Sequence, residues 1–387
     1  MHILFVLHDL SLTGAPKLGL QIAEAFARQV KVTLLARQDG NLRQHIHTAA
    51  FKEVVIDDAF HEDVTEARET RVSLGLDLVR RVNPDLIYVN SLAAAEWISI
   101  ARISQRPNVL HVHEMKQGML ALERNDLFNP YDVANCDYAV YASEECQRDF
   151  MESFAYPLER GLQFGVAVDI QSIRRQAKKT PSELVNVHGL KLENNKSTVA
   201  RRKRIAMCGT AVPRKGCDIF WHLAERMPWS DFLWIGSWDD DDFVLQHNAA
   251  LSLNKKKPLA NLYWTNTVHN PYAGIQLADL FTLTSREDPN PLVVLEALAL
   301  GVPVVAFTQT GGSKAFTSRY GYTLSGAIDT DRLANFCQRY FEGEPAQAPP
   351  PESLSGSIDV WIKSRELLDN LKRALSHREV VLQDRPL

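Results

Sequence analysis

Few cysteines, no long apolar run and no excess of charge of one sign characterise this sequence, and each absence excludes a class of protein. The 387 residues include five cysteines and no C-x-x-C pair, which argues against a zinc knuckle or a redox dithiol. An odd number of cysteines without a signal peptide favours reduced thiols in the cytoplasm. No apolar run approaches the roughly 18 residues of a membrane-spanning helix. The first residues also lack the basic region and cleavage site of a signal peptide.

Neither charge sign dominates the composition. Forty-three basic residues stand against 47 acidic ones, a net charge of −4, which argues against a broad nucleic-acid surface. Hydrophobic residues make up 45% and charged residues 23%, an ordinary globular composition that excludes disorder as the dominant state. At about 100–200 residues per domain, the length predicts two or three domains.

Short apolar runs alternate with amphipathic stretches in both halves of the chain. The runs are β-branched and nearly continuous in apolar character, as strands covered on both faces should be. Expected strands lie at 3–7, 32–36, 53–56, 86–90, 109–113 and 138–142, and then at 204–209, 232–237, 262–266, 280–285 and 303–307. Helical patterns such as 16–29 lie between them. Repeated strand–helix units predict two doubly wound, Rossmann-like α/β domains.

The alternation breaks over 170–203, a polar and basic stretch with no expected strand, which we interpret as a domain junction. We therefore predict an N-terminal domain over 1–168 and a C-terminal domain over 169–357. The latter ends in a Pro-rich linker at 342–356, and an amphipathic pattern follows within 358–387. Doubly wound sheets bind ligands outside the carboxyl ends of their strands, so the loops after the strands are the places to seek chemistry.

The loop and helix after the expected strand 280–285 carry two carboxylates, Asp288 and Glu296. Asn290 is placed to cap that helix, with Pro291 at its first position. The amides that open the helix are unpaired and could hold an anion. Each carboxylate can accept two hydroxyl hydrogen bonds, which suits a neutral polyol. A capped helix with a solvated glutamate is the alternative interpretation.

Two further loops have compositions suited to a phosphate ligand. Arg214 and Lys215 precede a helix, and two cations at a helix N-terminus suit a diphosphate; a solvated turn is the alternative. The loop matches neither the P-loop nor the dinucleotide-binding glycine pattern, so an ATPase and an NAD enzyme lose support. Gly311 and Gly312 let backbone amides approach a ligand closely, or form a flexible turn.

The first half carries weaker signals. Gly14 lies in a turn that opens the helix 16–29, with Pro16 in its first turn. His111 and His113 share one face at the end of a strand. A metal site there is conceivable, but no third ligand is in sight, so a structural role is favoured and we predict no metal.

These motifs, in their order and spacing over about residues 1–340, resemble retaining glycosyltransferases of family 4. That family has the GT-B fold, in which two Rossmann-like domains face a central cleft. Its donor signature has two acidic residues separated by seven others, and it ends in Leu-Glu-Ala. Here seven residues separate Asp288 from Glu296, and Ala297 follows Glu296. Asp288 stands where the family has Glu, and the adjacent Glu287 could replace that glutamate. Asn290 and Pro291 stand in place of Phe-Gly.

The resemblance implies a role for each motif. Glu296 would hold the nucleotide ribose and Asp288 would lie against the donor sugar. The pyrophosphate and sugar oxygens would meet the side chains and amides of the second-half loops, namely Arg214, Lys215, Asn290, Pro291, Leu292, Val293, Gly311 and Gly312. In the first domain, His113 would lie against the donor sugar, with the Gly14 loop near the phosphates and the acceptor. Ala315 stands where the family usually has Glu.

The function so implied is a retaining, metal-independent hexosyl- or glycosyltransferase in cell-surface polysaccharide or glycolipid biosynthesis. It would use a nucleoside-diphosphate sugar as donor, a glycan or lipid-linked saccharide as acceptor, and no further cofactor or nucleic acid. The last helix, within 358–387, would cross back onto the first domain. We expect the protein in the cytoplasm, where basic stretches at 174–179 and 201–204 could touch anionic lipid at the inner membrane face; a solvated junction is equally compatible.

Two alternatives remain open at this point. One is an enzyme of the same fold with different chemistry, such as a nucleotide-sugar epimerase or a phosphorylase. The other is a catalytically inactive binding or scaffold subunit, motivated by Asp288 and Ala315. The acidic run 239–242 resembles the metal-binding Asp-x-Asp of another glycosyltransferase architecture, but a solvated loop is favoured.

Overall fold

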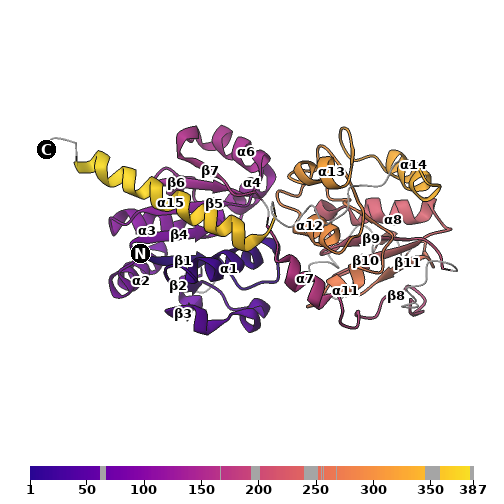
Figure 1. Cartoon of the computed structure of the whole chain (residues 1–387), viewed down its shortest axis with the longest axis horizontal. Coiled ribbons are helices and arrows are strands. Elements are labelled where there is room, and N and C mark those ends of the chain that lie inside the picture. Colours follow the sequence, from indigo (N-terminus) through magenta and orange to yellow (C-terminus); the bar gives the residue numbers. More distant parts are fainter. Residues whose placement is uncertain are drawn as a thin grey trace. The chain divides into compact units, whose positions relative to one another are not determined.

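The computed structural model describes residues 1–61, 67–165, 167–192, 201–238, 252–253, 255, 257–266, 268–344 and 358–383. The chain divides into two compact units (Figure 1). The first combines Met1–Ala167 with Ile358–Leu387, and the second is Val168–Ser357. The acidic run 239–242 and most of the Pro-rich linker, from residue 345, lie outside the described residues.

A seven-stranded parallel sheet forms the centre of the first unit. Its strands are β1 (His2–Leu7), β2 (Lys31–Ala36), β3 (Glu53–Ile56), β4 (Leu86–Asn90), β5 (Asn108–Val112), β6 (Tyr138–Tyr141) and β7 (Gly161–Gln163). They follow the order β3-β2-β1-β4-β5-β6-β7. The order reverses between β1 and β4, so the topological switch point of this sheet lies at the carboxyl ends of these two strands.

The helices of the first unit are α1 (Gly14–Ala27), α2 (Arg68–Val82), α3 (Glu96–Ile103), α4 (Lys116–Arg124), α5 (Pro130–Val133), α6 (Glu144–Phe154) and α15 (Val360–Gln383). The C-terminal α15 packs against α1 (Figure 1). The Arg28 guanidinium lies 3.7 Å from the centre of the Trp361 ring, and the Tyr138 hydroxyl donates to the Ala374 carbonyl at 3.1 Å. These contacts make α15 part of the first unit.

The second unit has a sheet of the same size. Its strands are β8 (Val185–Asn186), β9 (Arg204–Cys208), β10 (Asp231–Ile235), β11 (Leu262–Trp264), β12 (Leu280–Thr282), β13 (Val304–Phe307) and β14 (Tyr322–Leu324). The order is β14-β13-β12-β9-β10-β11-β8, and all pairs are parallel except β8 with β11. The reversal falls between β9 and β12, which sets the switch point of this sheet.

Six described α-helices flank this second sheet: α7 (Ile170–Gln176), α8 (Cys217–Arg226), α11 (Tyr272–Ile275), α12 (Leu292–Ala299), α13 (Lys314–Tyr320) and α14 (Thr330–Phe341). A short 3-10 turn, η6 (Pro213–Lys215), precedes α8. Within the described ranges, no helix is both long enough and apolar enough to cross a lipid bilayer.

The predicted fold class, two doubly wound α/β sheets, is confirmed. Every predicted strand is present, with ends that differ by up to three residues. The prediction that 170–203 contains no strand is wrong, because β8 lies there and follows the helix α7. β8 has two residues and forms an antiparallel sheet edge, so it has no apolar run for a sequence pattern to detect. β7 and β14, of three residues each, are also edge strands and were missed for the same reason.

Candidate functional site

Two loops meet at the switch point of the second unit. η6 follows β9, and the segment 284–288 follows the neighbouring β12. The Arg286 amide donates to the Arg214 carbonyl at 2.8 Å, and the Thr284 hydroxyl donates to the Lys215 carbonyl at 3.0 Å. In return, the exposed Arg214 guanidinium donates to the Glu287 carbonyl at 2.9 Å. The two loops are therefore bonded directly to each other.

Gly216 permits this close approach. Its φ of +69° is in the left-handed region, and a Cβ there would lie 1.9 Å from the Thr284 carbonyl oxygen. On the outer side, the Arg286 guanidinium makes two bonds to the Asp218 carboxylate, at 2.8 and 2.6 Å. This ion pair fixes the first turn of α8 to the loop after β12.

Lys215, which is partly buried, and the buried Asp288 form an ion pair at the centre of these loops. The Lys215 ammonium lies 2.5 Å from Asp288 Oδ2, and the Ser285 hydroxyl donates to the same oxygen at 3.2 Å. The Asp288 amide donates to the Thr310 carbonyl at 2.8 Å, and the Gly312 amide donates to the Asp288 carbonyl at 3.2 Å. Asp288 thus joins the cationic loop, its own loop and the glycine pair Gly311-Gly312.

Glu296 lies in the helix that follows the Asp288 loop. It is 3% exposed on α12, and the Tyr272 hydroxyl at the start of α11 donates to Glu296 Oε1 at 3.3 Å. The hydroxyl donor orients this buried carboxylate. No motif pointed to Tyr272 as this partner, because residues 24 positions apart on two helices have no sequence signature.

The predicted cap of α12 is wrong. The helix begins at Leu292 with Pro291 as its N-cap residue, and no side chain caps it. Pro291 has φ −73° and ψ 81°, and the Leu292 amide donates to the Asn290 carbonyl at 2.8 Å, as in an inverse γ-turn. The turn uses the Leu292 amide and leaves the buried Asn290 Oδ1 without a hydrogen-bond partner. Val293 lies in the first turn of the helix, where amides lack intrahelical acceptors.

In the first unit, Asn90 connects two of the predicted elements. Asn90 ends β4, and its amide nitrogen donates to the Ala15 carbonyl at 3.0 Å, one residue after Gly14 opens α1. Its Oδ1 lies 2.9 Å from Nε2 of His113, which directly follows β5. A Cβ at Gly19 of α1 would lie 2.6 Å from the Asn90 amide nitrogen, so this glycine makes room for the contact.

His111 and His113 stack on each other with ring centres 4.1 Å apart. His111 is fully buried; its Nδ1 lies 2.9 Å from the Tyr88 hydroxyl, and its Nε2 has no hydrogen-bond partner. Burial, with His8 as a second cause, lowers the pKa of His113 to about 3. Burial, and then the neighbouring His113, lowers the pKa of His111 well below its ordinary value. Both shifts favour the neutral form of the ring.

Glu114 joins the loops after β4 and β5. It accepts the Ser91 hydroxyl at 2.6 Å and the His113 amide at 2.9 Å. Ser91 has a φ of 94°, a conformation that non-glycine residues rarely adopt and that often occurs at functional sites. No sequence motif pointed to a role for Asn90, Ser91 or Glu114. In the described part of the chain, no three His, Cys, Asp or Glu side chains cluster as metal ligands would.

The structure therefore places the predicted site residues in several separate groups. Those of the second unit that lie on the bonded loops are Arg214, Lys215, Glu287, Asp288, Gly311 and Gly312. Glu296 contacts Tyr272 instead, and Asn290, Pro291, Leu292 and Val293 form the turn into α12. Gly14 and His113 belong to the first unit, connected through Asn90.

The basic stretch 201–204 is largely neutralised by neighbouring acids. Arg201 makes two bonds to the Asp279 carboxylate, at 2.7 and 2.8 Å, and Arg202 lies 2.9 Å from Asp231. Arg204 is 2% exposed. These arginines hold the amino ends of strands.

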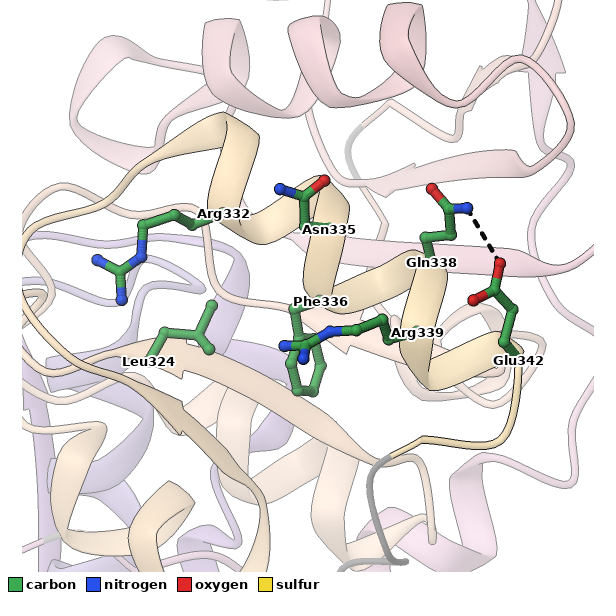
Figure 2. A pocket seen from close by; sticks show the side chains of 7 residues that line it. All are labelled: Leu324, Arg332, Asn335, Phe336, Gln338, Arg339 and Glu342. Atoms are coloured by element: carbon green, nitrogen blue, oxygen red, sulfur yellow. Dashed lines mark hydrogen bonds between the residues drawn. The ribbon is translucent and has the colours of Figure 1, made fainter.

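A separate hollow is lined by one side of α14 and the edge strand β14 (Figure 2). Its lining residues come from α14, its end and the edge strand β14: Leu324, Arg332, Asn335, Phe336, Gln338, Arg339 and Glu342. Gln338 donates to Glu342 at 3.0 Å across its rim. β13 and β12 separate β14 from β9, and no predicted site residue lines the hollow.

Parts of the chain are similar to known proteins. Residues 202–342 match the family described as glycosyl transferases group 1. A 127-residue segment is 30% identical to an uncharacterized glycosyltransferase of Haemophilus influenzae, covering 32% of this chain and 35% of that protein. The matched segment thus spans about a third of the relative's length.

Solved structures resemble the chain over nearly its whole length. HepE of Anabaena, solved in complex with UDP-glucose, has a TM-score of 0.73 at 18% identity and covers 96% of this chain and 100% of its own. WaaG, a glycosyltransferase involved in lipopolysaccharide biosynthesis, has a TM-score of 0.61 at 13% identity, covering 92% and 99%. The fold is the GT-B fold, and with the family match it supports a glycosyltransferase of the GT-B type.

Proposed function

We propose that this chain is a retaining glycosyltransferase that moves a sugar from a nucleoside-diphosphate sugar to an acceptor hydroxyl without a metal ion. One observation carries the proposal: Arg214, Lys215 and Asp288 meet on bonded loops at the switch point of the second unit. Ligands of doubly wound sheets bind at this place, and a cationic loop before a helix N-terminus suits the donor diphosphate.

Charge on the leaving group dominates the proposed chemistry. The bond between the anomeric carbon and the phosphate oxygen breaks as the acceptor oxygen bonds to the same carbon. Negative charge develops on the departing diphosphate, and Arg214 and Lys215 stabilise it electrostatically. The acceptor proton passes to the departing phosphate oxygen, so no protein base is required, and attack on the leaving-group side retains the anomeric configuration.

Asp288 has two roles in this proposal. Its carboxylate lies 2.5 Å from the Lys215 ammonium group. A diphosphate carries more negative charge than one carboxylate and competes for the ammonium group. Asp288 then accepts hydrogen bonds from the donor sugar, with Glu287 beside it. Glu296, oriented by Tyr272, accepts the ribose hydroxyls. The unpartnered Asn290 Oδ1 and the Val293 amide complete the polar lining in place of the Leu292 amide.

The biological setting proposed is the assembly of a cell-surface polysaccharide or glycolipid. The activity of WaaG in lipopolysaccharide biosynthesis supports this substrate class, and the UDP-glucose in HepE supports a nucleotide-sugar donor. The acceptor is a glycan or a lipid-linked saccharide. Exposed basic residues of the stretches 174–179 and 201–204 could contact anionic lipid at the membrane surface: Arg174, Arg175, Lys178, Lys179, Arg202 and Lys203.

An inactive binding subunit is the second candidate. Two observations favour it: the Lys215 ammonium is already paired with Asp288, and Ala315 stands where the family usually has a glutamate. A donor-turnover assay over a panel of nucleotide sugars separates the two, run on the wild type and on Glu296→Ala. Wild-type turnover with acceptor, lost in the variant, supports the transferase. Nucleotide binding without turnover by the wild type contradicts it and supports the binding subunit.

A further inference from the structure

The switch point of the first unit contains a hydrogen-bond chain whose donor and acceptor roles can be assigned without ambiguity. It runs from the Ala15 carbonyl through the Asn90 amide to the His113 ring. A carbonyl oxygen only accepts, so the Asn90 atom 3.0 Å from it must be the NH₂ group. Asn90 Oδ1 therefore faces His113 Nε2 at 2.9 Å.

The orientation of Asn90 determines the state of His113. An amide oxygen cannot donate, so Nε2 of His113 must carry the proton. A neutral ring with its proton on Nε2 has a lone pair on Nδ1. The groups that could change this state are His111, stacked on the ring, Glu114, which accepts the His113 amide, and His8 after β1. Burial of the ring opposes its protonation, which agrees with the lowered pKa of His113.

We propose that Asn90 is a positioning residue that fixes His113 as a neutral ring protonated on Nε2, so that His113 acts as a hydrogen-bond acceptor for a hydroxyl group through Nδ1. His113 is then neither a cation for a phosphate nor a general acid. A sugar hydroxyl is the class of ligand that such an acceptor recognises. This catalytic consequence rests on the proposed function, whereas the protonation state itself does not.

Several features hold Asn90 in this orientation. Asn90 is fully buried, and Gly19 leaves the space that its amide nitrogen occupies. The strained Ser91 follows it and donates to Glu114, the residue after His113. The loops after β4 and β5 are thus joined on both sides of the Asn90–His113 contact, which restricts rotation of either side chain.

Nitrogen-15 NMR of the histidine rings in the full-length chain tests the proposal directly. His113→Gln assigns the signals. The expected wild-type spectrum from pH 5 to 8 shows His113 neutral and protonated on Nε2. A ring protonated on Nδ1, or a cationic ring at pH 7, overturns the proposal. This measurement needs no substitution at Asn90, so it decides even where an Asn90 variant does not fold.

The role of Asn90 is tested with Asn90→Asp, which keeps the shape and places a carboxylate beside the ring. We expect His113 in that variant to become protonated near neutral pH. Asn108→Asp is the matched control, since Asn108 is also buried on β5 and donates to a carbonyl, that of Asn135 at 3.3 Å. An unchanged His113 spectrum in Asn90→Asp, or an equal change in Asn108→Asp, contradicts the assignment.

Kinetics supply the second readout. In the proposed reaction the second unit holds the donor by its diphosphate, so Asn90→Asp should lower kcat about tenfold with a smaller change in KM. Asn108→Asp should leave both constants near the wild-type values. An Asn90→Asp enzyme with wild-type kcat contradicts the catalytic consequence. A wild type with no transfer activity refutes the proposed function instead, and the NMR result still decides the state of His113.

Discussion

The two switch points of this molecule are built from different chemistry. In the second unit, ion pairs join the loops: Lys215 with Asp288 and Arg286 with Asp218. In the first unit, the contacts are hydrogen bonds without an ion pair: the Asn90 amide meets the His113 ring, the Tyr88 hydroxyl meets the His111 ring, and Glu114 accepts the Ser91 hydroxyl. A site for a diphosphate needs cations that can exchange partners, whereas a site for sugar hydroxyls needs oriented neutral acceptors. The contrast suits a charged ligand group at the switch point of the second unit and neutral hydroxyl groups at that of the first.

The largest effect is expected from Lys215→Met, which removes the cation and keeps the length of the side chain. Loss of one preorganised charge contact lowers turnover by about 10²–10³-fold. The substitution also leaves Asp288 buried and unpaired, which we expect to cost about 2 kcal/mol of unfolding free energy. Steady-state kinetics and chemical denaturation measure the two effects.

Lys314→Met is the matched control, since Lys314 is exposed and follows the same glycine loop. It should change neither quantity. The double variant Lys215→Met with Asp288→Asn should recover stability but not turnover. Turnover that returns with stability would show that the cation only supports the loop.

Gly216→Ala tests whether the close approach of the two charged loops is required. A Cβ 1.9 Å from the Thr284 carbonyl oxygen forces the loops apart, and we expect a loss of about 3 kcal/mol or more of unfolding free energy. Gly189→Ala is the control, because Gly189 has the same kind of backbone, φ +71°, with nothing within 4 Å of the added Cβ. It should cost about 1 kcal/mol. Equal losses in the two variants would assign the whole effect to backbone strain.

The neutral first site predicts a dependence of stability on pH. The pKa of folded His113 is lowered to about 3 from 6.5, so below pH 6.5 the unfolded chain binds a proton that the folded chain does not. Its contribution is fully present above pH 6.5 and is lost as the pH falls toward 3, by about 1.4 kcal/mol per pH unit. His113→Gln should flatten this slope in denaturation curves between pH 6 and 4.

His222→Gln, at an exposed helical position, is the control for that slope and should leave it unchanged. A slope that is the same in His113→Gln as in the wild type would mean that the His113 ring is accessible to protons in the folded state. The neutral character of the first site would then be wrong.

The smallest effect is expected from Tyr272→Phe. It removes the hydroxyl that donates to Glu296 at 3.3 Å and keeps the ring. A hydrogen bond of this length to a carboxylate is worth about 1 kcal/mol, so nucleoside diphosphates should bind about fivefold more weakly. Tyr263→Phe on β11 is the control for calorimetric titration. If Tyr272→Phe binds nucleoside diphosphates with unchanged affinity, Glu296 does not contact the nucleotide.

Sequence patterns predicted what depends on local composition. Continuous apolar runs identified the long central strands, and the position of Lys215 and Asp288 after two such strands placed them at one switch point. The cap of α12 was predicted wrongly, because Asn-Pro before an apolar run also fits the inverse γ-turn that forms around Pro291. Composition cannot choose between these two starts of a helix.

Contacts between distant positions could not be predicted. Asn90 and His113 are 23 residues apart on neighbouring strands, and their register decides whether they meet. Tyr272 reaches Glu296 from another helix. The pairing of Lys215 with Asp288 also required the structure, since both residues were expected to face the ligand rather than each other.

A crystal structure with the nucleoside diphosphate that raises the melting temperature most tests the central claim most directly. The account predicts that the diphosphate lies on Arg214 and Lys215, that the ribose contacts Glu296, and that the Asp288 carboxylate has left the Lys215 ammonium. A diphosphate bound elsewhere, such as in the hollow on α14, with the Lys215–Asp288 pair intact, would contradict it.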